Sequence, residues 1–323
     1  MSKYLFLASE RELDHDFCRK VAERAGLIFM PVISLSGFEA QLNDNPKCLF
    51  FWDIDFPDIE KPTHRYSLSH LTPILARHLK PQQVFGLADR SMFELSAAHR
   101  QSVIAHFCVR HYSEFAVEWI SEVCAPLFNH GPFGLDHYKE PGSVTQAVQL
   151  KRSTDRKQTL MAVDKLLRKH KFELRSREMV ISSVDELLMN AILDAPIDET
   201  GIRYRREVDI SSDFIFTEKE YVTMSVLVNT RSIVIGVFDH FGSFPTPAPG
   251  DLMRKDYSRA NYKVDPTTKS AGLGLRGISA SGICTIISCQ KDYGTEAVIG
   301  FPYYKSFKET KKGFRSFSLN ILG

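Results

Sequence analysis

An almost uninterrupted apolar run at residues 48–53 most constrains the fold of the first part of this chain. A strand that is apolar at nearly every position is buried on both faces, as in a parallel sheet covered by helices. Segments with helical periodicity separate this run from other short apolar runs. Those runs lie at residues 4–8, 27–32, 83–87 and 103–109. The alternation predicts an N-terminal doubly wound parallel sheet over residues 1–125, with a flavodoxin-like strand order.

Composition narrows the class of protein. The chain has 323 residues, a length typical of two domains, with 43% hydrophobic and 25% charged residues and a net charge of +2. This balance gives no reason to expect nucleic acid or a membrane surface as a partner. No apolar run reaches the ~18 residues of a transmembrane helix, and the first residues lack the apolar core of a signal peptide. The six cysteines show no C-x-x-C spacing, so we expect reduced core thiols in a cytoplasmic protein.

The rest of the chain divides into three segments. Residues 126–150 are rich in glycine, proline and histidine and show little apolar periodicity, which predicts a linker. Residues 151–305 begin with a predicted helix over 154–169 and form the second domain. Residues 306–323 are a tail that is first basic and then apolar. This tail either adds an edge strand to a sheet or docks on a second subunit, and the sequence leaves both open.

Acidic residues follow the apolar run 48–53. Asp53 ends the run, and the chain continues with the letters IDFPD. This pattern resembles the phospho-acceptor strand of bacterial response-regulator receiver domains, over roughly residues 1–125. The resemblance implies that Asp53 stands at the phospho-acceptor position. Alternatively, Asp53 and Asp55 only cap a strand and fix the turn before Pro57.

Three parts of a receiver site differ in this chain. The acidic pair after the first strand corresponds to residues 8–10, with the letters ASE, which offer one carboxylate at most. Ala88 replaces the usual Thr or Ser, and Arg110 stands at the place of a lysine. Mg²⁺ requires several oxygen ligands, and phosphoryl transfer requires its charge. We therefore expect a pseudoreceiver, an interaction domain that keeps the fold; a working receiver acting through Asp53 is the alternative.

Helical periodicity marks a buried stripe between residues 180 and 195. Beside this stripe, Glu186, Asn190 and Asp194 step by four and are predicted to stack on one other face of the same helix. A carboxylate and a carboxamide one turn apart suit a general base and a Mg²⁺ ligand. The alternative for such a pair is a solvated helix face.

A predicted β-hairpin follows this helix. Its strands lie over residues 221–228 and 233–238, and four polar residues separate them. The second strand leads into Asp239 and, three residues later, Gly242. An aspartate in this position can accept a hydrogen bond from an exocyclic amine such as that of adenine. Alternatively, Asp239 forms a strand-ending Asx turn.

A long loop and a second hairpin come next. The loop over residues 243–269 carries five basic residues and has the length of a lid, and its cations either meet phosphates or are solvated. Gly272 and Gly274 then precede a predicted short helix, whose free N–H groups can bind an anion. The second hairpin covers residues 283–301, and Thr295 lies beside its turn.

The order of these motifs over residues 150–303 resembles the ATP-binding domain of the GHKL superfamily. That superfamily includes histidine kinases, anti-sigma serine kinases and the gyrase-type and Hsp90-type ATPases. The resemblance implies an α/β sandwich, the Bergerat fold, in which helices cover one face of a mixed sheet. It implies ATP and Mg²⁺ as ligands, with Glu186 as the catalytic base and Asn190 as the Mg²⁺ ligand. The implied nucleotide-binding positions are Asn190, Asp239, Gly242, Gly272, Gly274 and Thr295.

Several positions depart from the GHKL pattern. Phe241 and Ser243 stand where the first glycine box has glycines, and Leu193 replaces a basic residue that contacts phosphate. The chain also has no H-E-x-x-x-P box for histidine autophosphorylation. Within the superfamily, the stand-alone anti-sigma-like regulators are therefore nearer than the sensor kinases.

Two functions remain open at this stage. The first is a cytoplasmic regulatory protein of two-component type, in which a pseudoreceiver is fused to an ATP-binding domain. It would act as a nucleotide-dependent switch or as a Ser/Thr kinase on a protein partner, with a homodimer as a possible assembly. The alternative is a non-enzymatic signalling scaffold with a degenerate nucleotide site, in which the Phe241 ring fills the pocket. Whether the chain is an enzyme stays open.

Overall fold

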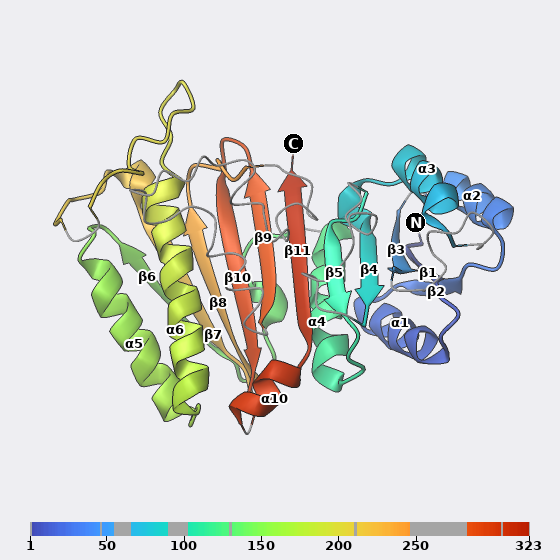
Figure 1. Cartoon of the computed structure of the whole chain (residues 1–323), viewed down its shortest axis with the longest axis horizontal. Coiled ribbons are helices and arrows are strands. Elements are labelled where there is room, and N and C mark those ends of the chain that lie inside the picture. The colour runs from blue at the N-terminus through green and yellow to red at the C-terminus, as the bar shows by residue number, and fades with distance from the viewer. Residues whose placement is uncertain are drawn as a thin grey trace. The chain divides into compact units, whose positions relative to one another are not determined.

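A computed structural model describes residues 2–45, 47–54, 66–89, 103–128, 131–209, 212–245, 283–304 and 306–322 (Figure 1). The described residues are mixed α/β and form two compact units. The first unit holds residues up to Pro132 together with Phe314–Leu319. The second unit holds the described residues from Phe133 to Gly313 and those after Leu319. Among the described residues, no helix is both long and apolar enough to span a bilayer.

The first unit is built on a parallel sheet with the strand order β2-β1-β3-β4-β5. Its strands are β1 (Tyr4–Ala8), β2 (Ile28–Pro31), β3 (Cys48–Asp53), β4 (Val84–Ala88) and β5 (His106–Val109). The helices are α1 (Glu12–Ala25), α2 (Leu35–Asp44), α3 (Leu68–His78) and α4 (Glu114–Cys124). Helix α1 packs on α4, and α2 packs on α3. Right-handed crossovers in this order place the two pairs on opposite faces of the sheet, which makes it doubly wound.

Strand β3 forms the centre of this sheet, as its composition predicts. All six of its residues are buried. The ring of Phe51 stacks on Phe85 of β4, with ring centroids 4.4 Å apart, and the Trp52 indole N–H donates to the Tyr66 carbonyl at 3.2 Å. An apolar strand flanked by parallel neighbours therefore holds the first unit together.

The second unit is built on an antiparallel sheet with the order β9-β10-β8-β7-β6. Its strands are β6 (Val144–Leu150), β7 (Val222–Val228), β8 (Ser232–Asp239), β9 (Cys284–Gln290) and β10 (Gly294–Pro302). Both predicted hairpins, β7–β8 and β9–β10, are present. Helices α5 (Asp155–Lys169) and α6 (Leu174–Met189) lie along one face of this sheet (Figure 1). The core between helices and strands includes Val163, Leu167, Val184, Leu188, Ile235 and Ile299.

Much of the predicted linker, residues 126–150, is instead an ordered part of the second unit. Strand β6 occupies its end and pairs with β7 along seven residues. Upstream, the Gly134 N–H donates to the buried Glu296 carboxylate at 2.6 Å, and Leu135 packs on Gly236, where a Cβ would lie 3.0 Å away. Burial raises the pKa of Glu296 to about 7. These contacts hold Gly134 and Leu135 against the sheet of the second unit.

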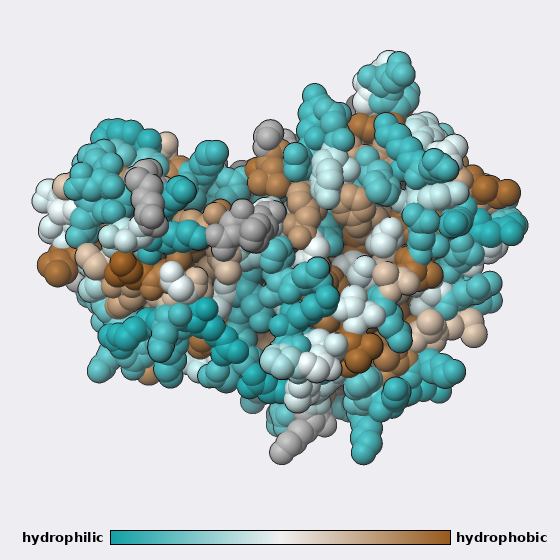
Figure 2. Space-filling model, turned by 180° about the vertical axis from the view of Figure 1, so that it is seen from behind, coloured by the Kyte–Doolittle hydropathy of each residue, from teal (hydrophilic) through white to brown (hydrophobic). Residues whose placement is uncertain are grey.

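The C-terminal segment that the sequence left open is part of the fold. Residues Phe307–Lys312 form helix α10 and Arg315–Leu322 form strand β11. Strand β11 pairs antiparallel with β5 of the first unit, from Arg315 opposite Val109 to Ser318 opposite His106. The first unit therefore ends in one antiparallel strand, which makes its sheet mixed. On the face shown in Figure 2, hydrophobic residues are scattered among hydrophilic ones, as is usual for protein surfaces.

Helix α6 provides a test of the second core. Replacing the fully buried Leu188 with alanine leaves a cavity under the helix and is expected to lower the free energy of unfolding by about 2–5 kcal/mol. Leu174→Ala on the same helix is the matched control, because that side chain is 57% exposed and its loss should cost less than about 0.5 kcal/mol. Urea unfolding followed by circular dichroism measures both. Equal losses in the two variants would contradict this packing of α6.

Candidate functional site

Asp239 and Thr295 meet at the end of two neighbouring strands. Asp239 is the last residue of β8 and lies opposite Thr295 of β10. The buried carboxylate accepts hydrogen bonds from the side chain and the backbone of Thr295. Burial raises the pKa of Asp239 to about 6, although these hydrogen bonds oppose the shift. The site therefore contains a carboxylate that titrates close to neutral pH.

The turn after β8 closes on the same carboxylate. The Phe241 N–H donates to Asp239 Oδ1 at 2.9 Å, and the Gly242 N–H also donates to it, which is the Asx turn foreseen as one alternative. Gly242 has a φ of +60°, and a Cβ there would lie 2.2 Å from the Gln290 carbonyl oxygen. Only glycine fits this turn. The Phe241 ring is buried, and the Lys219 ammonium lies over it at 5.3 Å.

Helix α6 carries the second group of predicted residues. Glu186 lies in its last turn, and Asn190 begins a π-helix over Asn190–Asp194. Both side chains are half-buried, and neither makes a hydrogen bond or ion pair within the part of the chain that the structure describes. Burial raises the pKa of Glu186, with contributions from the negative charges of Asp185 and Asp194. An unpaired carboxylate beside an unpaired carboxamide suits proton transfer or cation binding.

The π-helix corrects the predicted stacking of Glu186, Asn190 and Asp194. The Ala195 N–H donates to the Asn190 carbonyl at 2.8 Å, five residues back rather than four. The α-helical spacing that would place Asp194 on the same face as Glu186 and Asn190 therefore ends at Asn190. The wider turn keeps Leu193 in the core, 4% exposed. Single π-turns of this kind are frequent at functional sites.

Three hydrogen bonds, which we call the clamp, tie the end of the π-helix to the turn after β8. The Ser243 hydroxyl donates to the Ala195 carbonyl at 2.6 Å. The Arg203 guanidinium donates to the Asp194 carbonyl and to the Ser243 carbonyl at 3.1 Å. The Asp194 and Ala195 carbonyls are orphan acceptors of a helix end. The clamp therefore holds the helix of Glu186 and Asn190 against the turn of Asp239 and Gly242.

The arginines of this region were missed by sequence reasoning. Arg203 belongs to the clamp, and Arg206 Nε lies 3.3 Å from the Asp194 carboxylate. Burial raises the pKa of Asp194, and both arginines oppose that shift. The only signal in the sequence was the cluster of arginines at 203, 205 and 206 in a polar, irregular stretch.

Part of the predicted nucleotide site lies outside the described residues. Gly272 and Gly274 fall there, as does the predicted lid beyond residue 245. Of the predicted set, the structure brings Asp239, Gly242 and Thr295 together at one strand end. It links Glu186 and Asn190 to them through the clamp.

Asp53 of the first unit is held by two arginines. It ends β3 and is 1% exposed. Arg110 Nη2 lies 2.5 Å from its Oδ1, and Arg11 Nε lies 3.2 Å from its Oδ2. Arg110 also binds the fully buried Asp14 through Nε at 3.0 Å. A guanidinium with 4% side-chain exposure therefore supplies the positive charge at the predicted phospho-acceptor position.

Asp14 is the acidic partner that the sequence did not reveal. It comes from α1 rather than from residues 8–10, and it also accepts hydrogen bonds from Ser9 at 2.7 Å and Tyr112 at 2.9 Å. The carboxylate is thus already saturated with donors, which leaves little capacity for a cation. Among the described residues, no group of three or more His, Cys, Asp or Glu side chains is arranged to hold a metal ion.

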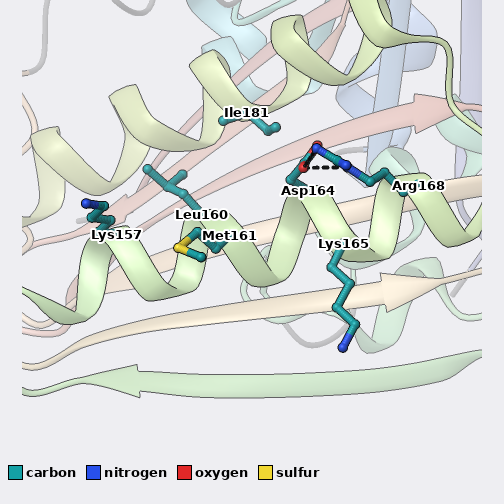
Figure 3. Close-up of a pocket in the computed structure, with 7 residues that line it drawn as sticks. All are labelled: Lys157, Leu160, Met161, Asp164, Lys165, Arg168 and Ile181. Carbon is teal, nitrogen blue, oxygen red and sulfur yellow. Dashed lines mark hydrogen bonds and ion pairs between the residues drawn. The ribbon is translucent and has the colours of Figure 1, made fainter.

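A hollow of about 440 Å³ lies elsewhere on the second unit, along α5 (Figure 3). It contains none of the predicted site residues. Its lining is Lys157, Leu160, Met161, Asp164, Lys165, Arg168 and Ile181.

No family model matches this chain, and no curated protein sequence is significantly similar.

The arginine cluster of the first unit predicts a large stability effect. Arg110→Met leaves the buried Asp14 and Asp53 without their main counter-charge, so the free energy of unfolding should fall by about 3–5 kcal/mol. Arg19→Met is the control, because the Arg19–Asp16 pair is more than half exposed and its loss should cost less than about 1 kcal/mol. Thermal unfolding at pH 7 compares them. An unchanged Arg110→Met variant would show that the buried carboxylates do not need this guanidinium.

Proposed function

We propose that the second unit is an ATP-binding domain of the GHKL type and the first unit a pseudoreceiver that regulates it. One observation carries the proposal: half-buried Glu186 and Asn190 lack partners within the described residues, and the clamp ties their helix to the turn of Asp239. Their polar atoms are not buried and unsatisfied, so they are available to a ligand without breaking a contact within the described part of the protein. Two helices on one face of the sheet agree with the sandwich that the resemblance implies.

Each residue has a role in this proposal. The Asp239 carboxylate accepts the amine of adenine beside Thr295. Because the carboxylate already accepts four hydrogen bonds within the protein, this amine shares or replaces one of them. Asn190 offers its amide oxygen to Mg²⁺, which neutralises phosphate charge when bound. Glu186 takes the proton from an attacking water or Ser/Thr hydroxyl as the phosphoryl group leaves ADP. Burial raises its pKa, which makes this carboxylate a stronger base than an exposed glutamate.

The first unit is proposed to be a pseudoreceiver because Arg110 and Arg11 already neutralise Asp53. In a working receiver a divalent cation has to approach the acceptor carboxylate. Here Asp14 and Asp53 instead share one buried guanidinium. The strand order β2-β1-β3-β4-β5 supports a receiver-like fold without the reaction. We infer a regulatory protein that changes its partner surface on nucleotide binding.

The second candidate is a scaffold that no longer binds nucleotide. The buried Phe241 ring favours it, because a bulky side chain stands where the backbone would approach adenine. Leu193 favours it also, since the expected phosphate contact is an apolar core residue. Ser243 favours neither candidate function, because its hydroxyl forms one of the three hydrogen bonds of the clamp.

Calorimetric titration with ATP and Mg²⁺ tests the proposal. We expect saturable binding that Asp239→Asn and Asn190→Ala each weaken about tenfold or more, since each removes a polar contact to the ligand. Asp213→Asn is the control, because that exposed carboxylate pairs with Arg152. No binding at millimolar ATP would contradict the proposal and support the scaffold.

The same titration has a predicted pH dependence. With its pKa raised to about 6, Asp239 is ionised at pH 7.5 and protonated at pH 5. In the protonated form one carboxyl oxygen carries the proton and is lost as an acceptor. Affinity should therefore fall as the pH drops through 6. Asp239→Asn should lose this dependence.

Incubation with acetyl phosphate and Mg²⁺ tests the pseudoreceiver. Because arginines occupy the cation's place beside Asp53, we expect no phosphoryl adduct in the intact mass. An adduct that disappears in Asp53→Asn would instead establish a working receiver.

A further inference from the structure

The hollow along α5 is an apolar trough between two helices. Leu160 and Met161 of α5 and Ile181 of α6 form its apolar part (Figure 3). Met161 is 65% exposed, which is high for an apolar side chain. Its flexible thioether can adapt to the surface of a partner. The lining extends from Lys157 to Arg168, about three helical turns or ~16 Å. A trough of this length matches the apolar face of a short helix.

The rim of this trough is positively charged. Its lining has three cations, Lys157, Lys165 and Arg168, against one carboxylate, Asp164. Lys157 and Lys165 make no ion pair within the described part of the chain. Figure 3 shows Arg168 turned toward Asp164 while Lys157 and Lys165 extend away from it. The two lysines therefore present uncompensated charge on the trough.

The negative charge of Asp164 does not offset the positive charges of Lys157 and Lys165. Asp164 is bound by Arg168 at 2.7 Å and by Arg177 of α6 at 3.1 Å. This double pairing fixes α5 on α6 and leaves a positive rim around apolar side chains. Exposed apolar side chains framed by one sign of charge mark a surface for a partner of the opposite sign.

We propose that this trough docks an acidic amphipathic helix of a partner protein. Leucine-like side chains at i, i+4 and i+7 of that helix would cover Leu160, Met161 and Ile181, and flanking carboxylates would meet Lys157 and Lys165. A helix fits better than a strand, because helices α5 and α6 offer no free backbone edge. No predicted nucleotide contact lines the trough, so this proposal does not rest on the proposed nucleotide site.

Fluorescence anisotropy with a designed peptide tests the trough. The probe is a labelled helical peptide of about 18 residues with leucines at i, i+4 and i+7 and glutamates on both flanks; its matched partner carries lysines instead. The full-length chain should bind the acidic peptide saturably and at least about tenfold more tightly than the basic one. Lys157→Glu/Lys165→Glu should reverse this preference, and Met161→Glu should weaken both peptides.

Lys20→Glu on the exposed side of α1 is the control and should leave both affinities unchanged. No binding at millimolar peptide, equal affinity for both peptides, or a preference that survives the double reversal would overturn the proposal. So would self-association of the wild-type chain, measured by sedimentation, that Met161→Glu abolishes, because the trough would then be an interface between copies. Circular dichroism tests whether the variants are folded. We expect that they are, because the substituted side chains lie on the surface.

Discussion

The clamp is the contact on which the candidate site depends. Backbone carbonyls at the end of a π-helix would be unsatisfied without the hydroxyl of Ser243 and the guanidinium of Arg203. By accepting these donors, they connect two segments far apart in sequence, one with Glu186 and one with Asp239. A serine that departs from the glycine-box pattern thus has a structural reason. The departure alone is no evidence against a nucleotide site.

The first unit also contains buried carboxylates, but there the protein itself supplies the positive charge beside them. Its carboxylates at Asp14 and Asp53 are paired within the protein by Arg110, so the site needs no added ion. In the second unit Glu186 and Asn190 are left without such partners among the described residues. The contrast between buried carboxylates that are ion-paired within the protein and half-buried polar groups that are not is the physical basis on which we propose regulation for one unit and ligand binding for the other.

Local patterns predicted most strands and both hairpins, because an apolar run such as Cys48–Asp53 can only be a buried strand here. Strand β6 was missed, since its residues are mostly exposed and lack apolar periodicity. The contribution of Asp14 was hidden because it comes from a helix five residues after Ser9 and reaches the strand end only in three dimensions. Likewise, no pattern places Arg203 on the Asp194 carbonyl. Sequence reveals periodic elements, whereas long-range polar contacts need coordinates.

The most direct test of a nucleotide site is amide NMR of the full chain with Mg²⁺ and a non-hydrolysable ATP analogue. The account predicts that the signals of Asn190, Gly242 and Thr295 shift together and follow one dissociation constant. These residues come from three separate elements, so a common response requires a shared ligand. Signals that stay unchanged at millimolar analogue, or that respond with unrelated affinities, would contradict the account.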